Sequence, residues 1–415
     1  MVFAMSIRLT SFLIATLSVV TACVGDGATT PPMPDASVAD SSTALPDSSP
    51  PDASVCSPGL TLCGGKCADL TMGAANCGSC GHDCGDAMCS NGNCSVATIA
   101  NVDHPVGVAA AGTAVFWLAD DRANNFGNLD TCPIVGCTPQ LIRVVNGDFD
   151  INFPLNPHTG PVLLTDGTYL QWIAKDATVG NPNNDAYSCP IVGCDHYSRG
   201  VAQTPDDVTQ LAVGGSPRKL FFRYTLGSAR TCPFGTCNNG NQTNISLPSD
   251  QNAVSIAADL TNLYFDDPFK STVNSCPIGT AACAGKSVSL FSPGSQFLAS
   301  NGTILVAVSG GQSVFACATT GCTGQPTTLA SNQPNITALV VDAQNAYFAL
   351  GGSPGQANGE IRSCALPDCK GGVKSLATGL AAPNSLALSN NVLFWSNGGI
   401  TGGQPMPGSI QKLSL

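Results

Sequence analysis

The sequence is poor in charged and aromatic residues. Only 10% of its 415 residues are charged, 6% are aromatic, and Glu360 is the single glutamate. So few charges cannot supply the polar faces of long amphipathic helices, and the many glycines and prolines favour short strands joined by turns. The net charge is −11, and no segment is rich in lysine or arginine. This argues against nucleic acid as a partner and against adsorption to anionic lipid by charge.

Long hydrophobic runs are missing after the N-terminus, and the one at 12–20, FLIATLSVV, is too short to span a bilayer. It leads into VTAC at 20–23, which resembles the lipobox of bacterial lipoproteins. The resemblance implies a signal peptide at 1–22 and acylation of Cys23, which would attach the protein stably to a membrane. The alternative is an ordinary secretory signal followed by a stray cysteine.

Cysteine, in contrast, is abundant, and 21 cysteines indicate an oxidising compartment. With Cys23 lipidated, an even number remains for disulfides. Eight of them lie in 56–94, a segment too short and too poor in large apolar residues to fold on a hydrophobic core. Disulfides would replace that core, although the sequence leaves their pairing open. The alternative is a zinc site with the spacing of Cys77, Cys80, His82 and Cys84.

The pattern of 56–94, CGG-C-DL followed by NCGSCG, resembles a small cysteine-rich module near the N-termini of bacterial surface lipoproteins. That resemblance implies no activity. The segment before it is rich in Pro, Ser, Ala and Asp and predicts a disordered tether. We therefore expect four parts: a lipoprotein signal peptide at 1–22, a lipidated linker at 23–55, a cysteine-rich module at 56–94 and a repeat domain at 95–415.

Two features alternate along the repeat domain. The first is a cysteine pair, as in the near-identical heptapeptides TCPIVGC at 131–137 and SCPIVGC at 188–194. The second is a strand rich in apolar and aromatic residues. The six cysteine pairs are Cys132/Cys137, Cys189/Cys194, Cys232/Cys237, Cys276/Cys283, Cys317/Cys322 and Cys364/Cys369. The seven strands are AVFWLAD (114–120), YLQWIAK (169–175), KLFFRYT (219–225), NLYFDDP (262–268), TILVAVS (303–309), NAYFALG (345–351) and VLFWSNG (392–398).

Each repeat predicts a first strand, a tight turn, the aromatic strand, a longer loop, a third strand, the cysteine hairpin and a fourth strand. Four short antiparallel strands per repeat of about 40–50 residues are typical of β-propeller blades. We therefore expect an all-β fold: a seven-bladed β-propeller of four-stranded antiparallel blades, preceded by the small disulfide-rich module and the tether. Because the strand at 303–309 is weak, six or eight blades are alternatives.

The last repeat has only three strands, at 385–389, 392–396 and 409–415, whereas SVATIANV at 95–102 precedes the first repeat. The N-terminal strand would therefore complete the last blade and close the ring, which removes an unpaired strand edge. The aromatic strand motif after a D-x-x-N/T turn resembles YWTD- and NHL-like propellers, especially bacterial secreted members with a cysteine hairpin in each blade. This resemblance implies the fold and no particular function.

The cysteine hairpins predict disulfides that staple the outer, least buried strands of the blades. Loop entropy gives each six-residue ring about 2 kcal/mol of stability. Metal or redox chemistry is the alternative, but four residues separate the cysteines of most pairs, unlike the two of a redox motif. Repetition in six blades also argues against a single catalytic role.

A candidate ligand face gathers the loops between strands two and three and the connections between blades. We expect there two histidines, His104 and His158, and acidic residues of the long loops in the first two repeats: Asp120, Asp121, Asp176 and Asp185. Loops rich in carboxylates and amides can bind Ca²⁺ or a sugar. Solvated turns and loop histidines are the alternative, and because no complete set of ligands stands out, we assign no metal, no cofactor and no catalytic residue.

Together these observations predict an extracytoplasmic lipoprotein of the bacterial cell envelope, at the outer membrane or the cell surface. Its propeller would act as a monomeric scaffold that binds an envelope or extracellular protein, peptide or glycan, without enzymatic activity. The alternative is a lactonase-like propeller hydrolase or lyase with a metal or a histidine in the central channel. The first strands of the repeats, such as VGVAAA and TQLAV, lack the carboxylates that such a metal needs.

Overall fold

The computed structural model describes residues 56–415 apart from short gaps at 122–125, 147–160, 176–183, 195–197, 200–207, 225–228, 238–239, 248–254, 268–269, 280–282, 284–287, 292–294, 323, 354–355, 399, 402–403 and 406–407. The signal peptide and linker expected at 1–55 lie outside this part. Across the described residues, no helix is both long and apolar enough to span a membrane.

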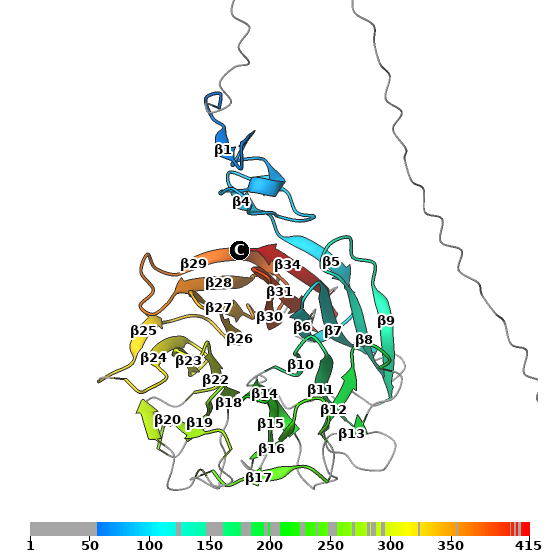
Figure 1. The fold of residues 1–415 in the computed structure, drawn as a ribbon, viewed down its shortest axis with the longest axis vertical. Helices are drawn as coiled ribbons and strands as arrows, with labels where there is room; N and C mark the ends of the chain where they lie inside the picture. Colours follow the sequence, from blue (N-terminus) through cyan, green and yellow to red (C-terminus); the bar gives the residue numbers. More distant parts are fainter. Residues whose placement is uncertain are drawn as a thin grey trace, which may run out of the picture. The chain divides into compact units, whose positions relative to one another are not determined.

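Seven four-stranded antiparallel sheets form a ring of blades (Figure 1). Blades 1 to 3 are β6 (Pro105–Ala111), β7 (Ala114–Asp121), β8 (Phe126–Pro133), β9 (Gln140–Asn146); β10 (Leu163–Thr165), β11 (Tyr169–Lys175), β12 (Asn184–Pro190), β13 (Ser198–Arg199); and β14 (Val208–Gly214), β15 (Lys219–Tyr224), β16 (Ala229–Pro233), β17 (Thr243–Ile245). Blades 4 to 6 are β18 (Ile256–Ala258), β19 (Asn262–Asp267), β20 (Thr272–Pro277), β21 (Val288–Phe291); β22 (Phe297–Ser300), β23 (Ile304–Ser309), β24 (Ser313–Ala318), β25 (Thr327–Ala330); and β26 (Ile336–Val341), β27 (Asn345–Leu350), β28 (Gly359–Ala365), β29 (Lys374–Leu380). The seven-bladed propeller is confirmed.

Blade 7 combines the two ends of the propeller. Its strands are β30 (Pro383–Ser389), β31 (Val392–Asn397), β34 (Ser409–Ser414) and, from the N-terminal side, β5 (Ala97–Asn101). β5 pairs antiparallel with β34, with Ala100 opposite Ile410. The expected closure of the ring is therefore present. A two-stranded sheet of β32 (Ile400–Thr401) and β33 (Gln404–Pro405) lies in the loop before β34.

The turns between the first two strands explain the D-x-x-N/T signal. In blade 4, Asp259 accepts hydrogen bonds from the backbone N–H groups of Thr261 and Asn262, at 2.7 and 2.8 Å. Its second carboxylate oxygen accepts from Tyr264 Oη at 2.5 Å. Blade 6 repeats this arrangement, and Asp166 and Asn301 cap the backbone of the same turn in blades 2 and 5. The side chain thus fixes the turn and orients the aromatic strand.

The core lies between the blades. The second strands are buried almost throughout, and they supply nearly all of the large side chains with less than 2% exposure: Trp117, Trp172, Trp395, Tyr264, Phe116, Phe222, Phe265, Phe348 and Phe394. Apolar clusters join one blade to the next, as in the cluster that contains Leu118 of blade 1, Trp172 of blade 2 and Phe222 of blade 3. Stacking of sheets, rather than any helix, therefore provides the hydrophobic core.

Each of the six cysteine pairs in the ring forms a disulfide that closes the hairpin between strands three and four. The pairs are Cys132–Cys137, Cys189–Cys194, Cys232–Cys237, Cys276–Cys283, Cys317–Cys322 and Cys364–Cys369. The pairing expected within each hairpin is therefore present in all six blades. The pair in blade 4 also closes, although its sequence separation is 7 rather than 5.

The expectation that these staples lie at poorly buried edges is wrong for most of the cysteines. Cys237 is fully buried, and Cys194 is only 3% exposed, because the hairpins pack into the apolar clusters between blades. The expectation holds only for the second cysteines of blades 1, 5 and 6, namely Cys137, Cys322 and Cys369, which are partly exposed. Even these three contact the clusters of buried residues. The disulfides therefore belong to the core as well as to the rim.

The cysteine-rich module contains β1 (Thr61–Cys63), β2 (Lys66–Ala68), β3 (Cys89–Ser90), β4 (Asn93–Cys94) and one 3-10 turn, η1 (Ala74–Asn76). Its four disulfides are Cys56–Cys67, Cys63–Cys80, Cys77–Cys89 and Cys84–Cys94. The sulfur atoms of Cys77, Cys84 and Cys89 lie within 4.8 Å of one another. Because each belongs to a disulfide, they do not supply thiolates to a metal, which argues against the zinc alternative.

Candidate ligand-binding face

The two faces of the ring differ in what they carry. In blade 1, Pro105 at the start of β6 pairs with Ala119, Asp121 at the end of β7 pairs with Phe126, and Phe126 pairs with Asn146. One face, here called the loop face, therefore carries the loops between strands two and three and the connections between blades. The opposite face, the hairpin face, carries the tight turns and the cysteine hairpins. Neighbouring blades share this orientation.

The predicted disulfide cysteines lie at the hairpin face, away from the candidate ligand residues. The first cysteine of each pair lies opposite the beginning of the second strand, as Cys132 opposite Val115 and Cys364 opposite Ala346 show. The second cysteines, among them Cys137, Cys194 and Cys369, follow in the hairpins beyond the third strands. The disulfides therefore take no part in the candidate ligand site.

The predicted site residues fall at the loop face where they can be placed. His104 directly precedes β6, has a φ of 47°, and its Nδ1 is buried with no hydrogen-bond partner among the described residues. Asp185 lies near the start of β12 and is 1% exposed. The backbone of Asp120 and Asp121 ends β7, but their side chains lie outside the described residues, as do His158 and Asp176 altogether.

Blades 3, 4 and 7 add buried polar side chains to this face that the sequence analysis did not single out. Arg223 near the end of β15 is 8% exposed, and Asp266 and Asp267 at the end of β19 are each 2% exposed. Asn397 ends β31 and is also 2% exposed. Burying such groups is unfavourable unless they are paired, so their concentration at one end of the second strands indicates a constrained polar site.

Arg223, Asp266 and Asp267 all have polar partners. Arg223 Nη1 donates to Thr209 Oγ1 at 2.6 Å, and Asp266 Oδ1 accepts from the backbone N–H of Ser255 at 2.7 Å. Burial lowers the pKa of the Arg223 guanidinium, while the negative charge of Asp266 opposes this effect. Asp267 forms an ion pair at 3.6 Å with the exposed Lys270. Both signs of charge are thus present at the loop-face ends of β15 and β19.

A sequence signal for these residues exists. In KLFFRYT and NLYFDDP, charged residues directly follow a run of buried aromatic residues, without an intervening turn residue. Strand geometry then places them inside the last paired positions of the sheet, as the register of Arg223 with Ala229 and of Asp266 with Val273 confirms. A charged residue within a strand, rather than in the loop after it, is therefore the sequence signal for these buried charges.

The central channel is mostly apolar. A cavity of about 230 Å³ is lined by the first strands of five blades, with aliphatic side chains such as Leu163, Leu298, Leu339 and Leu386. Its polar side chains are hydroxyls and one amide; for example, Thr337 Oγ1 donates to the carbonyl of Pro383 at 2.6 Å. The described lining residues include no carboxylate and no imidazole. They therefore offer no set of ligands for the metal of the hydrolase alternative, which stays a prediction.

Comparison with known proteins identifies the fold and nothing finer. No family model matches the sequence, and no curated protein matches it. The structure of U3-55K has a TM-score of 0.54 and 11% sequence identity, and the match covers 77% of this chain and 98% of that one. The computationally designed Ika8 protein has a TM-score of 0.48 and 14% sequence identity, and the match covers 77% of this chain and 99% of that one. The β-propeller domain of the Trilobed protease from Pyrococcus furiosus has a TM-score of 0.49 and 8% identity, and the match covers 76% of this chain and 94% of that one. The likeness to U3-55K concerns the fold alone.

The ten disulfides indicate the kind of compartment in which the protein is stable. They lie in both the module and the ring, and together they use every cysteine from Cys56 onward. Such a number indicates an extracellular or otherwise oxidising environment.

Proposed function

We infer that this protein is a lipid-anchored binding protein of the bacterial envelope, in which the loop face of the propeller recognises a polar ligand and no reaction is catalysed. The observation that carries this inference is the row of buried charged and amide side chains at the loop face. Its members are Asp185, Arg223, Asp266, Asp267 and Asn397.

The composition of this row favours a glycan or a peptide as the ligand. Carboxylates, an amide and a guanidinium are the groups that bind sugar hydroxyls and peptide amides, and placing a few of them in rigid surroundings is typical of small-ligand sites. The ring holds these groups on strands rather than on loops, which keeps their positions fixed. The acyl chains on Cys23, at the start of the linker, would anchor the protein to the lipid membrane.

Binding to immobilised envelope glycans and peptides tests the role of the loop face. Asp267→Asn removes one charge from the polar row and should weaken binding about tenfold, because a charged hydrogen-bonding group contributes about 1.5–3 kcal/mol. Asp368→Asn is the matched control, since Asp368 is an exposed carboxylate on a cysteine hairpin of the hairpin face. Equal effects of the two substitutions would contradict the assignment of the face.

Two further measurements separate the remaining parts of the proposal. Cys23→Ala should move the protein from the membrane fraction to the aqueous fraction and abolish incorporation of a labelled fatty acid. Retention in the membrane would show that the lipobox resemblance is misleading. Stoichiometric zinc or calcium in the purified full chain would instead support the hydrolase or lyase.

A further inference from the structure

Blade 7 is the only one of the seven blades without a cysteine hairpin. Its third strand, β34, ends near the C-terminus, and its fourth strand is β5, which comes from the other end of the propeller. Lys412 of β34 pairs with Ala97 at the start of β5, so this end of blade 7 belongs to the hairpin face. The cysteine-rich module directly precedes β5, and it therefore enters the ring at the place where the other blades have their hairpins.

The sequence of β34 differs from that of other third strands at two adjacent positions. Leu413, opposite Leu393, replaces the first cysteine of the hairpin. Lys412, opposite Phe394, replaces a small residue. In blades 1 to 6 that residue is Thr131, Ser188, Thr231, Ser275, Ala316 and Ser363. A long cation therefore stands beside the missing disulfide.

Lys412 is almost completely buried, at 4% exposure, and it connects blade 7 with two other segments. Its Nζ donates to the carbonyl oxygen of Ile134, in the disulfide-closed hairpin of blade 1. It also forms an ion pair at 3.2 Å with Oδ2 of Asp86, in the cysteine-rich module. The same Asp86 oxygen accepts a hydrogen bond from the backbone N–H of Gly136 at 3.0 Å. Blade 7, blade 1 and the module thus meet at one carboxylate.

The buried ammonium makes Asp86 necessary. A buried cation without a partner is strongly destabilising, and Asp86 is the one carboxylate within ion-pair distance of Lys412 among the described residues. The hydrogen bond from Gly136 lowers the pKa of Asp86 and, with a smaller contribution from Lys412, keeps the carboxylate charged. Apolar packing supports the contact, because the buried cysteines Cys77 and Cys94 of the module belong to one cluster with Leu413 and Trp395 of blade 7.

We propose that the cysteine-rich module is the staple of blade 7: Asp86 binds Lys412 and the hairpin of blade 1, and so locks the seam at which the ring closes. The module then packs against the propeller and stabilises it, instead of being a flexibly attached spacer. Because the module joins the ring to the preceding linker, the latch also fixes the point at which the anchored end of the chain meets the propeller. That last consequence depends on the proposed lipid anchor, whereas the latch itself does not.

Hydrogen exchange of the full chain tests the latch. Asp86→Ala should accelerate exchange of the amides of β34 and β5 about tenfold or more, because these strands close the ring, while exchange in β27 and β28 of blade 6 should stay unchanged. Asp86→Asn keeps an oxygen that can accept from Gly136 and should give an intermediate effect. Lys412→Met removes the buried charge and keeps the stem, so its effect should be smaller than that of Asp86→Ala.

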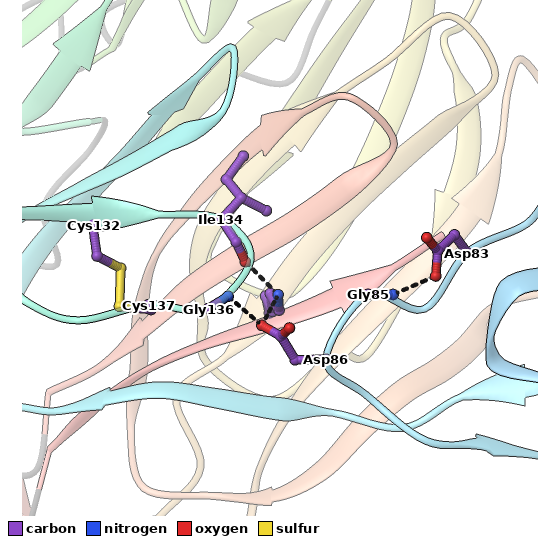
Figure 2. A network of polar contacts seen from close by, with 8 residues as sticks. Asp83, Gly85, Asp86, Cys132, Ile134, Gly136 and Cys137 are labelled. Atoms are coloured by element: carbon purple, nitrogen blue, oxygen red, sulfur yellow. Dashed lines mark hydrogen bonds and ion pairs between the residues drawn. A yellow bond between two sulfur atoms is a disulfide. The ribbon is translucent and has the colours of Figure 1, made fainter.

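Asp83→Ala is the matched control, since Asp83 lies in the same module but, within the described part of the chain, accepts a hydrogen bond only from Gly85, at 2.9 Å (Figure 2). Unchanged exchange in β34 and β5 after Asp86→Ala would overturn the latch. So would equal acceleration by Asp83→Ala, which would point to general loosening of the module. A larger effect of Lys412→Met than of Asp86→Ala would also refute it, because packing of the lysine stem would then be the main contribution.

Discussion

The six hairpin disulfides of the ring provide a test of what such staples contribute. Cys232–Cys237 and Cys317–Cys322 close rings of the same size, with a sequence separation of 5 in each. Chain entropy therefore assigns both the same stabilisation, about 2 kcal/mol. Their surroundings differ, since Cys232 and Cys237 are 2% and 0% exposed, whereas Cys322 is only half-buried.

Replacing each pair by alanine separates entropy from packing. Loss of a buried sulfur adds a cavity term of about 1 kcal/mol per atom to the loss of the ring. We expect Cys232→Ala/Cys237→Ala to lower the free energy of unfolding by about 4 kcal/mol and Cys317→Ala/Cys322→Ala by about 3 kcal/mol. In a ring of this size, each kcal/mol corresponds to a fall in melting temperature of about 2 °C.

Differential scanning calorimetry of the two double variants, with free-thiol titration to confirm that the other disulfides stay intact, makes the comparison. Equal losses of about 2 kcal/mol would show that packing of the sulfurs contributes nothing. Melting temperatures equal to that of the unmodified protein would refute the staple itself. A larger loss for the Cys317 variant would reverse the order that burial predicts.

Two further predictions concern single carboxylates. Asp342→Ala removes the acceptor for the backbone N–H groups of Gln344 and Asn345 and for Tyr347 Oη. The free energy of unfolding, measured by urea denaturation, should therefore fall by about 2–3 kcal/mol. A loss no larger than that of Asp368→Ala would show that the Asp342 side chain does not stabilise the turn. Burial raises the pKa of Asp130 to about 6, so the folded state binds its proton more tightly and stability falls as pH rises from about 4 through 6. Asp130→Asn should therefore gain about 1–2 kcal/mol relative to the unmodified protein between pH 4 and 7.5, allowing for partial solvation, and a pH-independent difference would contradict this origin.

The architecture could be predicted from sequence because its determinants are local and repeated. The Asx turn, the aromatic second strand and the cysteine hairpin each occupy fewer than about ten residues, and six or seven copies average out the weak ones. The fifth second strand illustrates this. TILVAVS contains no aromatic residue, yet β23 covers Ile304–Ser309 and is as buried as its neighbours. Its place in the repeat, rather than its own composition, identified it.

Features that depend on distant partners could not be predicted. In SIQKLSL, the alternation of apolar and polar residues gives no sign that the lysine is buried. Lys412 is buried together with its partner, Asp86, which precedes it by 326 residues in the sequence. Asp86 belongs to the cysteine-rich module, which the sequence predicts as a part separate from the propeller. The same limit applies to the disulfide pairing within 56–94 and to the charge balance between Arg223 and Asp266, which lie on adjacent blades. Only their spatial arrangement reveals those contacts.

The position of the latch follows from the way in which the ring closes. A short cysteine hairpin requires the third and fourth strands of a blade to be consecutive in the chain, as they are in blades 1 to 6. In blade 7 the fourth strand, β5, precedes the third, β34, by about three hundred residues, so no six-residue hairpin can join them. A hairpin disulfide of the kind found in blades 1 to 6 therefore cannot form at this seam, and the residues that lead into β5 are placed to supply a substitute. The module supplies Asp86 from that side, and β34 supplies Lys412 at the residue beside the missing cysteine. In this propeller, extra stabilisation is therefore needed at the hairpin-face end of blade 7. The cysteine-rich module is the segment of the chain placed to give it.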